Sequence, residues 1–338
     1  MKAFVLMAPR ISLVADVQEP VARSGEAVVA VSRAGVCGTD VEFFTGEMAY
    51  LHSGEATYPL RIGHEWCGTV ISAGEGVDKR WVGRRVVGDT MLGCGKCQLC
   101  RTNRQHVCKD RYEIGIRHGW AGALAEQLVV PVSALHRLPD SLDDTIGALI
   151  EPGGNALRSV EAAEAGPGKR ILICGSGTIG LLSAQIALDL GAEVHIFGRN
   201  SETLKLALDL GVTAIVQNFD PISGGYDAVI DATNDREIPN KAITIVEPGG
   251  KVVFIGISAD PSQIDTRSPV LKDVTAIGIL SASPGITKVI DLYATGRVDP
   301  RPIVAATVSL SQVDSILAGS RPIGAGPGPK IHVDPKLG

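Results

Sequence analysis

The chain has 338 residues, of which 45% are apolar and 40 are glycine. This length and composition fit an enzyme of two domains, each with its own core. A formal net charge of −5 at pH 7 argues against nucleic-acid binding, which requires a basic face. No apolar run approaches the roughly 20 residues of a membrane-spanning helix. Four of the seven cysteines crowd between residues 94 and 108, which predicts metal binding rather than disulfides, and hence a cytoplasmic protein.

The first part of the chain consists of short β-type runs separated by glycine and proline. These runs cover residues 27–31, 68–72, 85–87 and 127–131. Several short strands without a long helix between them predict a barrel-like β domain. Beyond about residue 285 the chain carries one helical segment, 285–296, and a final strand, 330–333, which we assign to this first domain. Residues 1–145 and 285–338 are therefore expected to form one β-rich domain.

Between these two parts, strand and helix patterns alternate. A helical pattern over 144–164 is interrupted at 151–154, and further helices are expected at 178–190 and at 201–210, where Ser201 is the expected N-cap. Strands are expected at 170–174, 193–197, 214–216, 227–231, 251–256 and 274–278. This alternation predicts an α/β domain over residues 146–284, with a doubly wound parallel sheet.

A glycine-rich segment follows the first of these strands and opens the next helix. It consists of Gly175, Ser176, Gly177, Thr178, Ile179 and Gly180. The first glycine makes a tight turn, the second lets the backbone approach a pyrophosphate, and the third lets the helix pack on the strand. The helix N-terminus then offers free N–H groups to the phosphates. We therefore predict a dinucleotide-binding site.

The end of the next strand indicates which nicotinamide cofactor binds. An NAD site usually has Asp or Glu there, which accepts hydrogen bonds from the ribose 2′-hydroxyl. This chain has Gly198, Arg199, Asn200 and Ser201 instead. Glycine leaves room for a 2′-phosphate, the guanidinium can bind it with two hydrogen bonds, and the other two side chains can add donors. The pattern favours NADP, with NAD as the alternative.

Four cysteines form a compact potential metal site. They are Cys94, Cys97, Cys100 and Cys108. Four sulfurs at this spacing can surround one Zn²⁺ with no open position, which is the pattern of a structural site. An iron–sulfur cluster is the rival, but its ferredoxin form has a shorter last gap and a following proline, where this chain has Lys109. We predict structural zinc.

A second set of potential metal ligands is dispersed along the chain. Cys37 follows a strand, and Thr39 adds a hydroxyl two residues later. His64 and Glu65 are adjacent, and they point to opposite faces if their segment is a strand. Glu151 opens the nucleotide domain. A Cys, a His and one or two carboxylates can form a catalytic zinc site that keeps a position for water or substrate. The sequence alone leaves open whether these residues meet.

Taken together, five motifs resemble those of the zinc-dependent medium-chain alcohol dehydrogenase superfamily, in the same order and over essentially the whole chain. They are Gly-Val-Cys-Gly-Thr-Asp at 35–40, Gly-His-Glu-x-x-Gly at 63–68, the four-cysteine loop, Glu-Pro at 151–152, and the glycine loop at 175–180. The resemblance implies a GroES-like catalytic domain built from both chain ends, with a Rossmann domain inserted between them.

The resemblance also implies a ligand set for catalytic zinc. Cys37, His64 and Glu151 would bind the metal, and Asp40 would orient His64, as carboxylates behind a metal ligand commonly do. Glu65 is similar to a neighbouring glutamate that ligates zinc in some members and lies just behind it in others. Two zinc ions per chain are therefore expected.

The implied reaction is hydride transfer between an alcohol and the nicotinamide, with zinc lowering the pKa of the alcohol. Thr39 would take the substrate proton, and Glu42 stands where many members have a relay histidine. Residues 37–42 are similar to archaeal-type glucose dehydrogenases, whereas residues 151–156 are similar to threonine and polyol dehydrogenases. The substrate could therefore be a sugar, a polyol or another alcohol.

Four further expectations follow. The alternative function is a catalytically inactive, zinc-stabilised sensor or structural protein that binds a nucleotide. Lys330 is interpreted as a contact to the cofactor phosphates or as a surface lysine, and His106 as a solvent-exposed residue of the four-cysteine loop. Relatives are commonly dimers or tetramers, so the resemblance implies a homodimer or homotetramer.

Overall fold

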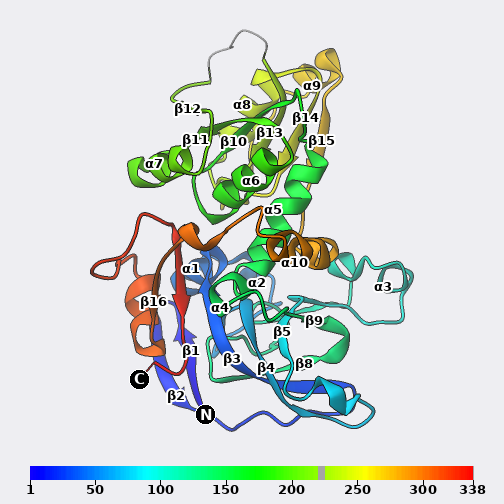
Figure 1. Ribbon diagram of the computed structural model, residues 1–338, viewed down its shortest axis with the longest axis vertical. Coiled ribbons are helices and arrows are strands. Elements are labelled where there is room, and N and C mark those ends of the chain that lie inside the picture. The colour runs from blue at the N-terminus through cyan, green and yellow to red at the C-terminus, as the bar shows by residue number, and fades with distance from the viewer. Residues whose placement is uncertain (220–224, 338) are drawn as a thin grey trace.

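The computed structural model describes residues 1–219 and 225–337. These residues form two bodies stacked along the long axis of the molecule, each built around one large sheet (Figure 1). The upper body in Figure 1 holds a six-stranded sheet from the middle of the chain. The lower body holds a seven-stranded sheet to which both ends of the chain contribute strands.

The six-stranded sheet is parallel throughout, in the order β12-β11-β10-β13-β14-β15. Its strands are β10 (Arg170–Cys174), β11 (Glu193–Phe197), β12 (Ala214–Val216), β13 (Tyr226–Asp231), β14 (Val246–Phe254) and β15 (Thr275–Gly278). Ile171, Leu172 and Ile173 of the central β10 are fully buried, because helices cover both faces of such a sheet. The strand order reverses between β10 and β13, which confirms the predicted doubly wound sheet.

The helices of this region follow the predicted alternation, with two corrections. They are α4 (Asp144–Gly147), α5 (Ile150–Ala162), α6 (Thr178–Asp189), α7 (Ser201–Asp209), α8 (Ile238–Ile245), α9 (Arg267–Lys272) and α10 (Ile286–Ala294). The pattern over 144–164 is broken at Ala148 and Leu149, not at 151–154. Pro152 is tolerated in the first turn of α5, where a backbone N–H has no partner within the helix. Asn200, not Ser201, caps α7, because its Oδ1 accepts the N–H groups of residues 202 and 203.

The seven-stranded sheet has the order β16-β17-β3-β4-β5-β9, with β8 also paired to β3. Its strands are β3 (Glu26–Val36), β4 (Glu65–Ala73), β5 (Arg85–Gly88), β8 (Gln127–Pro131), β9 (Leu135–Arg137), β16 (Val304–Val308) and β17 (Lys330–Val333). The final strand β17 lies between β16 and β3. This confirms the assignment of residues 330–333 to the sheet of the N-terminal part.

Smaller elements complete the lower body. They are β1 (Lys2–Ala8), β2 (Ile11–Asp16), α1 (Gly38–Thr45), α2 (Ala49–His52), β6 (Met91–Leu92), α3 (Gln98–Arg101), β7 (Tyr112–Glu113) and α11 (Val313–Leu317). The hydrophobic core of the lower body contains large side chains such as Phe4, Phe43 and Trp66, each at most 2% exposed. Within the described residues, no helix is both long enough and apolar enough to cross a membrane.

Helix α10 packs against the upper body. Its side chains Val289, Ile290 and Tyr293 belong to the same buried cluster as residues of α5 and α6, and Figure 1 shows α10 beside the lower end of α5. The chain rejoins the seven-stranded sheet only at β16. The expected domain boundary at residue 285 stays a prediction. Helix α10, which follows that boundary, packs against the core of the six-stranded sheet.

Candidate metal centres and nucleotide site

Strand pairing brings the dispersed ligand candidates together. In the antiparallel pair of β3 and β4, Gly35 lies opposite Glu65. Cys37 follows the end of β3, and His64 precedes the start of β4, so the two residues meet at the same end of the pair. One potential ligand atom each of Cys37, His64 and Glu65 lies within 4.8 Å of the other two.

The condition under which His64 and Glu65 would point to opposite faces is not met. That expectation assumed that both residues belong to a strand, but β4 begins at Glu65 and His64 precedes it. Gly63, with φ of 99°, turns the backbone just before His64, a conformation that favours glycine. Both side chains therefore reach the same point.

Glu151 lies beside this cluster, in the first turn of α5. It is buried, and its Oε1 accepts a hydrogen bond of 2.9 Å from the Asn155 amide. Burial raises the pKa of Glu151 to about 7, while His64 lowers it and the charge of Glu65 raises it further. The carboxylate therefore interacts with the cluster electrostatically, although it is not one of the three residues whose ligand atoms lie within 4.8 Å.

Asp40 holds the two ligand-bearing loops together through their backbones. Its carboxylate is fully buried and accepts the N–H of Cys37 at 2.9 Å and the N–H of Gly63 at 3.1 Å. The distance from its Oδ1 to Nδ1 of His64 is 3.8 Å, too long for a hydrogen bond. Asp40 therefore makes no direct hydrogen bond to the His64 ring. It binds the backbone of Cys37 and of Gly63, the residue before His64, instead.

The chemistry of this cluster suits a cation. Thiolate sulfur, imidazole nitrogen and carboxylate oxygen are the ligands that zinc takes in proteins. Burial alone would lower the pKa of His64, but Cys37, Asp40 and Glu151 together raise it well above its usual value. The Nδ1 atom of His64 is buried without a hydrogen-bond partner among the described residues. A buried site with this excess of negative groups fits a bound divalent metal.

Thr39 and Glu42 lie three residues apart on α1, and so on one side of that helix. Both are partly buried. Burial raises the pKa of Glu42, and the nearby Glu47 raises it further. No described hydrogen bond joins the two residues directly. A proton can therefore pass between them only through another group.

The four predicted cysteines converge in a separate lobe between β6 and β7. Their Sγ atoms all lie within 4.8 Å of one another, and the Cys97–Cys100 distance is 3.5 Å. The backbone N–H groups of Lys96 and Cys97 lower the pKa of Cys94 to about 6. His106 is buried beside this lobe, so the expectation that it is exposed is wrong, and it is not part of the cluster. Four converging thiols fit a closed zinc site.

The glycine loop has the backbone that a dinucleotide requires. Gly175 has φ of 107°, and a Cβ atom on Gly180 would collide with the carbonyl oxygen of Gly175. Gly177 caps α6, and a Cβ atom there would meet no heavy atom within 4 Å. The first and third glycines are therefore fixed by the fold, whereas the second faces open space at a helix N-terminus.

Gly198 packs closely against the glycine loop. A Cβ atom at this position would collide with the Ser176 hydroxyl, which is buried and lies 2.7 Å from the Thr203 hydroxyl. Glycine is required here because Ser176 fills the space. This contact accounts for the glycine, and the expected room for a 2′-phosphate beside Gly198 stays a prediction.

The charged group of the same loop remains accessible. The Arg199 side chain is 75% exposed, and it forms an ion pair with Asp235 on the loop after β13. The Asn200 side-chain oxygen is occupied by capping α7. Arg199 is therefore the main candidate for contacting a 2′-phosphate, and it would have to leave or share Asp235 to do so.

Asp231 is a buried carboxylate at the cofactor edge that the sequence interpretation did not single out. It is the last residue of β13 and pairs with Cys174, the residue immediately before the glycine loop. Its Oδ1 accepts hydrogen bonds from the N–H of Thr233 at 3.0 Å and from the Thr233 hydroxyl at 2.7 Å. Burial raises the pKa of Asp231 to about 6, against the lowering effect of these bonds.

Replacing Asp231 with asparagine is expected to stabilise the protein at pH 8 and to change its stability little at pH 4. Because the folded-state pKa of Asp231 is above the ordinary value, stability falls as the pH rises from about 4 through about 6. The replacement should recover about 2 kcal/mol of unfolding free energy at pH 8. Urea unfolding at both pH values checks this, with Asp260→Asn, 73% exposed, as the control. An equal effect of Asp231→Asn at both pH values would contradict the account.

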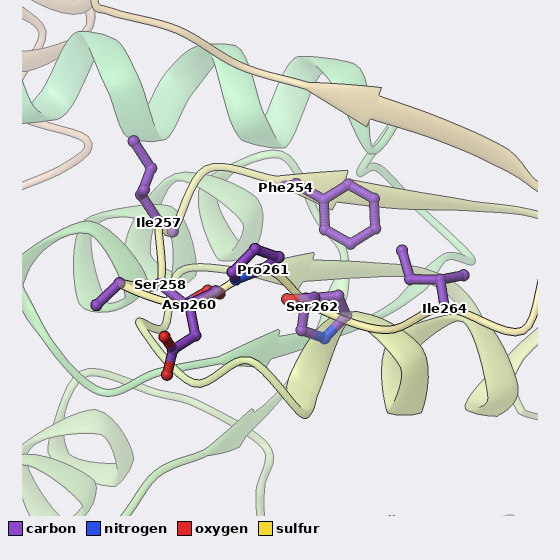
Figure 2. Close-up of a pocket in the computed structure, with 10 residues that line it drawn as sticks. Phe254, Ile257, Ser258, Asp260, Pro261, Ser262 and Ile264 are labelled. Atoms are coloured by element: carbon purple, nitrogen blue, oxygen red, sulfur yellow. The ribbon is translucent and has the colours of Figure 1, made fainter. Parts of the chain in front are cut away.

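A pocket of about 430 Å³ opens where β14 ends (Figure 2). In Figure 2, Phe254 and Ile264 lie along its apolar side, and Asp260 and Ile257 project from the loop that follows β14. This is the carboxyl edge of the parallel sheet, the edge at which doubly wound folds bind their ligands. The pocket contains none of the metal-cluster residues. The sequence pattern had indicated only a strand here.

Two family models match the chain. The alcohol dehydrogenase GroES-like domain matches residues 23–140, and the zinc-binding dehydrogenase family matches residues 178–295. The first range contains Cys37, the His64–Glu65 pair and the four cysteines. The second begins within the glycine loop and continues to the end of α10.

Individual relatives agree with these matches. L-threonine 3-dehydrogenase of Coxiella burnetii is 32% identical over 265 residues, which cover 75% of this chain and 76% of that protein. A protein described as a zinc-binding dehydrogenase from Sinorhizobium meliloti, bound to NADP, superposes with a TM-score of 0.89 at 28% identity, over 99% of both chains. An alcohol dehydrogenase from Escherichia coli, in complex with NADH, gives 0.89 at 25% identity, also over 99% of both chains. The chain belongs to the zinc-dependent medium-chain alcohol dehydrogenase superfamily.

Proposed function

We propose that this protein transfers a hydride between an alcohol and NADP at a zinc ion held by Cys37, His64 and Glu151, with Glu65 close by. A second zinc would sit in the four-cysteine lobe. The observation that carries the proposal is the convergence of Cys37, His64 and Glu65 within 4.8 Å, next to the start of α5. Three elements far apart in sequence build this one site, and its charge suits a metal.

Different residues would carry out the separate steps of the proposed reaction. Zinc, when bound, would polarise the substrate oxygen and lower the pKa of an alcohol. Thr39 would accept the hydroxyl proton, and Glu42 would receive a proton from Thr39 through an intervening group, since burial raises the pKa of Glu42 and so favours its protonated form. The glycine loop and the N-terminus of α6 would hold the pyrophosphate. The nicotinamide would then receive the hydride from the substrate carbon.

The substrate is proposed to be a sugar, a polyol or another alcohol with polar neighbours, including hydroxy amino acids. Supporting this range is the similarity to L-threonine 3-dehydrogenases, together with the polar residues on α1. A panel of sugars, polyols, threonine and simple alcohols, assayed at 340 nm with NADP and with NAD, tests the proposal. Turnover of any such alcohol supports it, and the absence of turnover in zinc-loaded protein would defeat it.

Replacing Arg199 with alanine is expected to raise the Michaelis constant for NADP by roughly ten- to a hundredfold and to leave that for NAD within about twofold. One charge-assisted pair with a phosphate is worth about 1.5–3 kcal/mol, and NAD has no 2′-phosphate. Steady-state kinetics with both cofactors measure the ratio. Arg236→Ala removes a nearby surface guanidinium (59% exposed) and serves as the control. Equal losses with both cofactors would contradict the preference for NADP.

A second candidate keeps the fold without catalysis, as a zinc-stabilised nucleotide sensor or structural protein. A broken catalytic cluster would favour it, but the described residues include all four candidate ligands. We also propose that the chain is cytoplasmic and forms a homodimer or homotetramer. Its proposed domains are residues 1–145 with 285–338, and 146–284. Light scattering of the purified protein tests the oligomeric state.

A further inference from the structure

A lysine from the last strand of the chain reaches the metal cluster. Lys330 opens β17 and is 2% exposed. Its Nζ donates to Oε2 of Glu65 at 2.6 Å, to Oε1 of Glu65 at 2.8 Å, and to the carbonyl oxygen of Val36 at 2.9 Å. All three donors of the ammonium group are therefore used. Both interpretations of Lys330 from the sequence, a cofactor-phosphate contact and a surface lysine, are wrong for this structure.

The sheet provides a path for this contact. Strands β4, β3 and β17 are adjacent, and Glu65, Gly35 and His332 lie opposite one another across them. A Cβ atom on Gly35 would collide with Oε2 of Glu65. The Glu65 side chain therefore extends across the backbone of Gly35 towards Lys330. Lys330 lies two residues before His332, and so on the same face of β17.

Charge on both partners makes the contact strong. The Lys330 and Glu65 side chains form an ion pair at 2.6 Å, with 3% and 2% of the two side chains exposed. His332 is fully buried with both ring nitrogens unpartnered among the described residues, and burial lowers its pKa to about 3. It is neutral and does not compete for Lys330. A buried carboxylate that accepts two hydrogen bonds from one ammonium group is held firmly, since losing that partner would leave buried negative charge without it.

We propose that Lys330 is a positioning residue that competes with the metal for Glu65 and keeps this carboxylate from becoming a permanent zinc ligand. The inference rests on the proposed zinc site. Glu65 has a potential ligand atom within 4.8 Å of those of Cys37 and His64, and both of its oxygens bond to Lys330. With zinc bound at the proposed site, Glu65 would therefore lie between two cations. With Lys330 in place, a coordination position stays available for Glu151 or for substrate.

The test measures how fast the catalytic zinc is lost to a colorimetric chelator. Lys330→Met removes the competing charge and keeps most of the side-chain volume, so Glu65 should turn to the metal. Zinc release is expected to slow by roughly tenfold or more, the size of effect that groups around a metal site commonly have. The double variant Lys330→Met with Glu65→Gln should return to the wild-type rate. Lys330→Arg, which keeps the charge, should resemble wild type.

Glu65→Gln alone separates the outcomes if Lys330→Met folds poorly. Lys330 is then intact. If Glu65 does not bind zinc in the wild-type protein, its removal should keep the rate of zinc release within about twofold of wild type. Release at least tenfold faster in Glu65→Gln would overturn the inference, as would unchanged release in Lys330→Met. Absence of a second zinc in the wild-type protein would instead defeat the proposed function, which distinguishes the two failures.

Discussion

Replacing Cys37 with serine is expected to remove one of two zinc ions per chain and to lower kcat/KM for hydride transfer by about a thousandfold or more. The thiolate is a ligand of the proposed catalytic zinc, and polarisation of a substrate oxygen by a metal is worth several kcal/mol. A loss of about 4 kcal/mol of transition-state stabilisation corresponds to that factor. Metal analysis of the purified variant and initial rates at 340 nm measure both effects.

A matched control is the neighbouring thiol Cys67. It is fully buried, and its sulfur lies 3.3 Å from the carbonyl oxygen of Asp144, outside both metal clusters. Cys67→Ala should retain both zinc ions and turnover within about tenfold, even if its stability falls by the 1 kcal/mol typical of a core substitution. If Cys37→Ser kept two zinc ions, or transferred hydride at the wild-type rate, the assignment of Cys37 would be wrong.

Replacing Cys97 with alanine is expected to release the second zinc and to lower the melting temperature by about 10 °C or more. The elements of the lobe that carries the four cysteines are short and include α3 and the two-stranded pair of β6 and β7, so we expect its fold to depend on the metal. Structural zinc contributes strongly to the folding of small metal-binding units, and each kcal/mol lost shifts the melting temperature by about 2–4 °C. Calorimetry with metal analysis measures both.

The control for this lobe is Lys96→Ala. Lys96 is exposed and lies between two of the cysteines, so its removal should leave the zinc content at two ions and the melting temperature within about 2 °C, as expected for a surface change. A Cys97→Ala protein that melts at the wild-type temperature would show that the lobe does not depend on zinc for its structure.

The elements of the fold that the sequence predicted are those with local signals. Each of the six strands of the parallel sheet contains a short apolar segment, and the loop at 175–180 combines three glycines with a strand before it and a helix after it. Each of these patterns is complete within about ten residues. The four cysteines likewise fall within one short segment, so their convergence required no knowledge of the fold.

The errors concern contacts between distant segments. Nothing near Lys330 indicates Glu65, which is 265 residues away and reaches it only because β17 lies next to β3. The glycine at 198 also has a reason that the cofactor pattern did not include, because the Ser176 side chain lies where a Cβ atom of residue 198 would stand. The opposite orientation of His64 and Glu65 was expected only if both residues lie in a strand, and β4 begins at Glu65. Strand starts and strand neighbours are set by the whole sheet.

The most direct test of the central claim is to remove and restore the catalytic zinc while hydride transfer is followed. Protein from which a chelator has withdrawn one zinc per chain, with the four-cysteine zinc retained, should have lost at least about 99% of its turnover. One equivalent of added zinc should restore it. Hydride transfer at the full rate by protein that retains only the four-cysteine zinc would contradict the account.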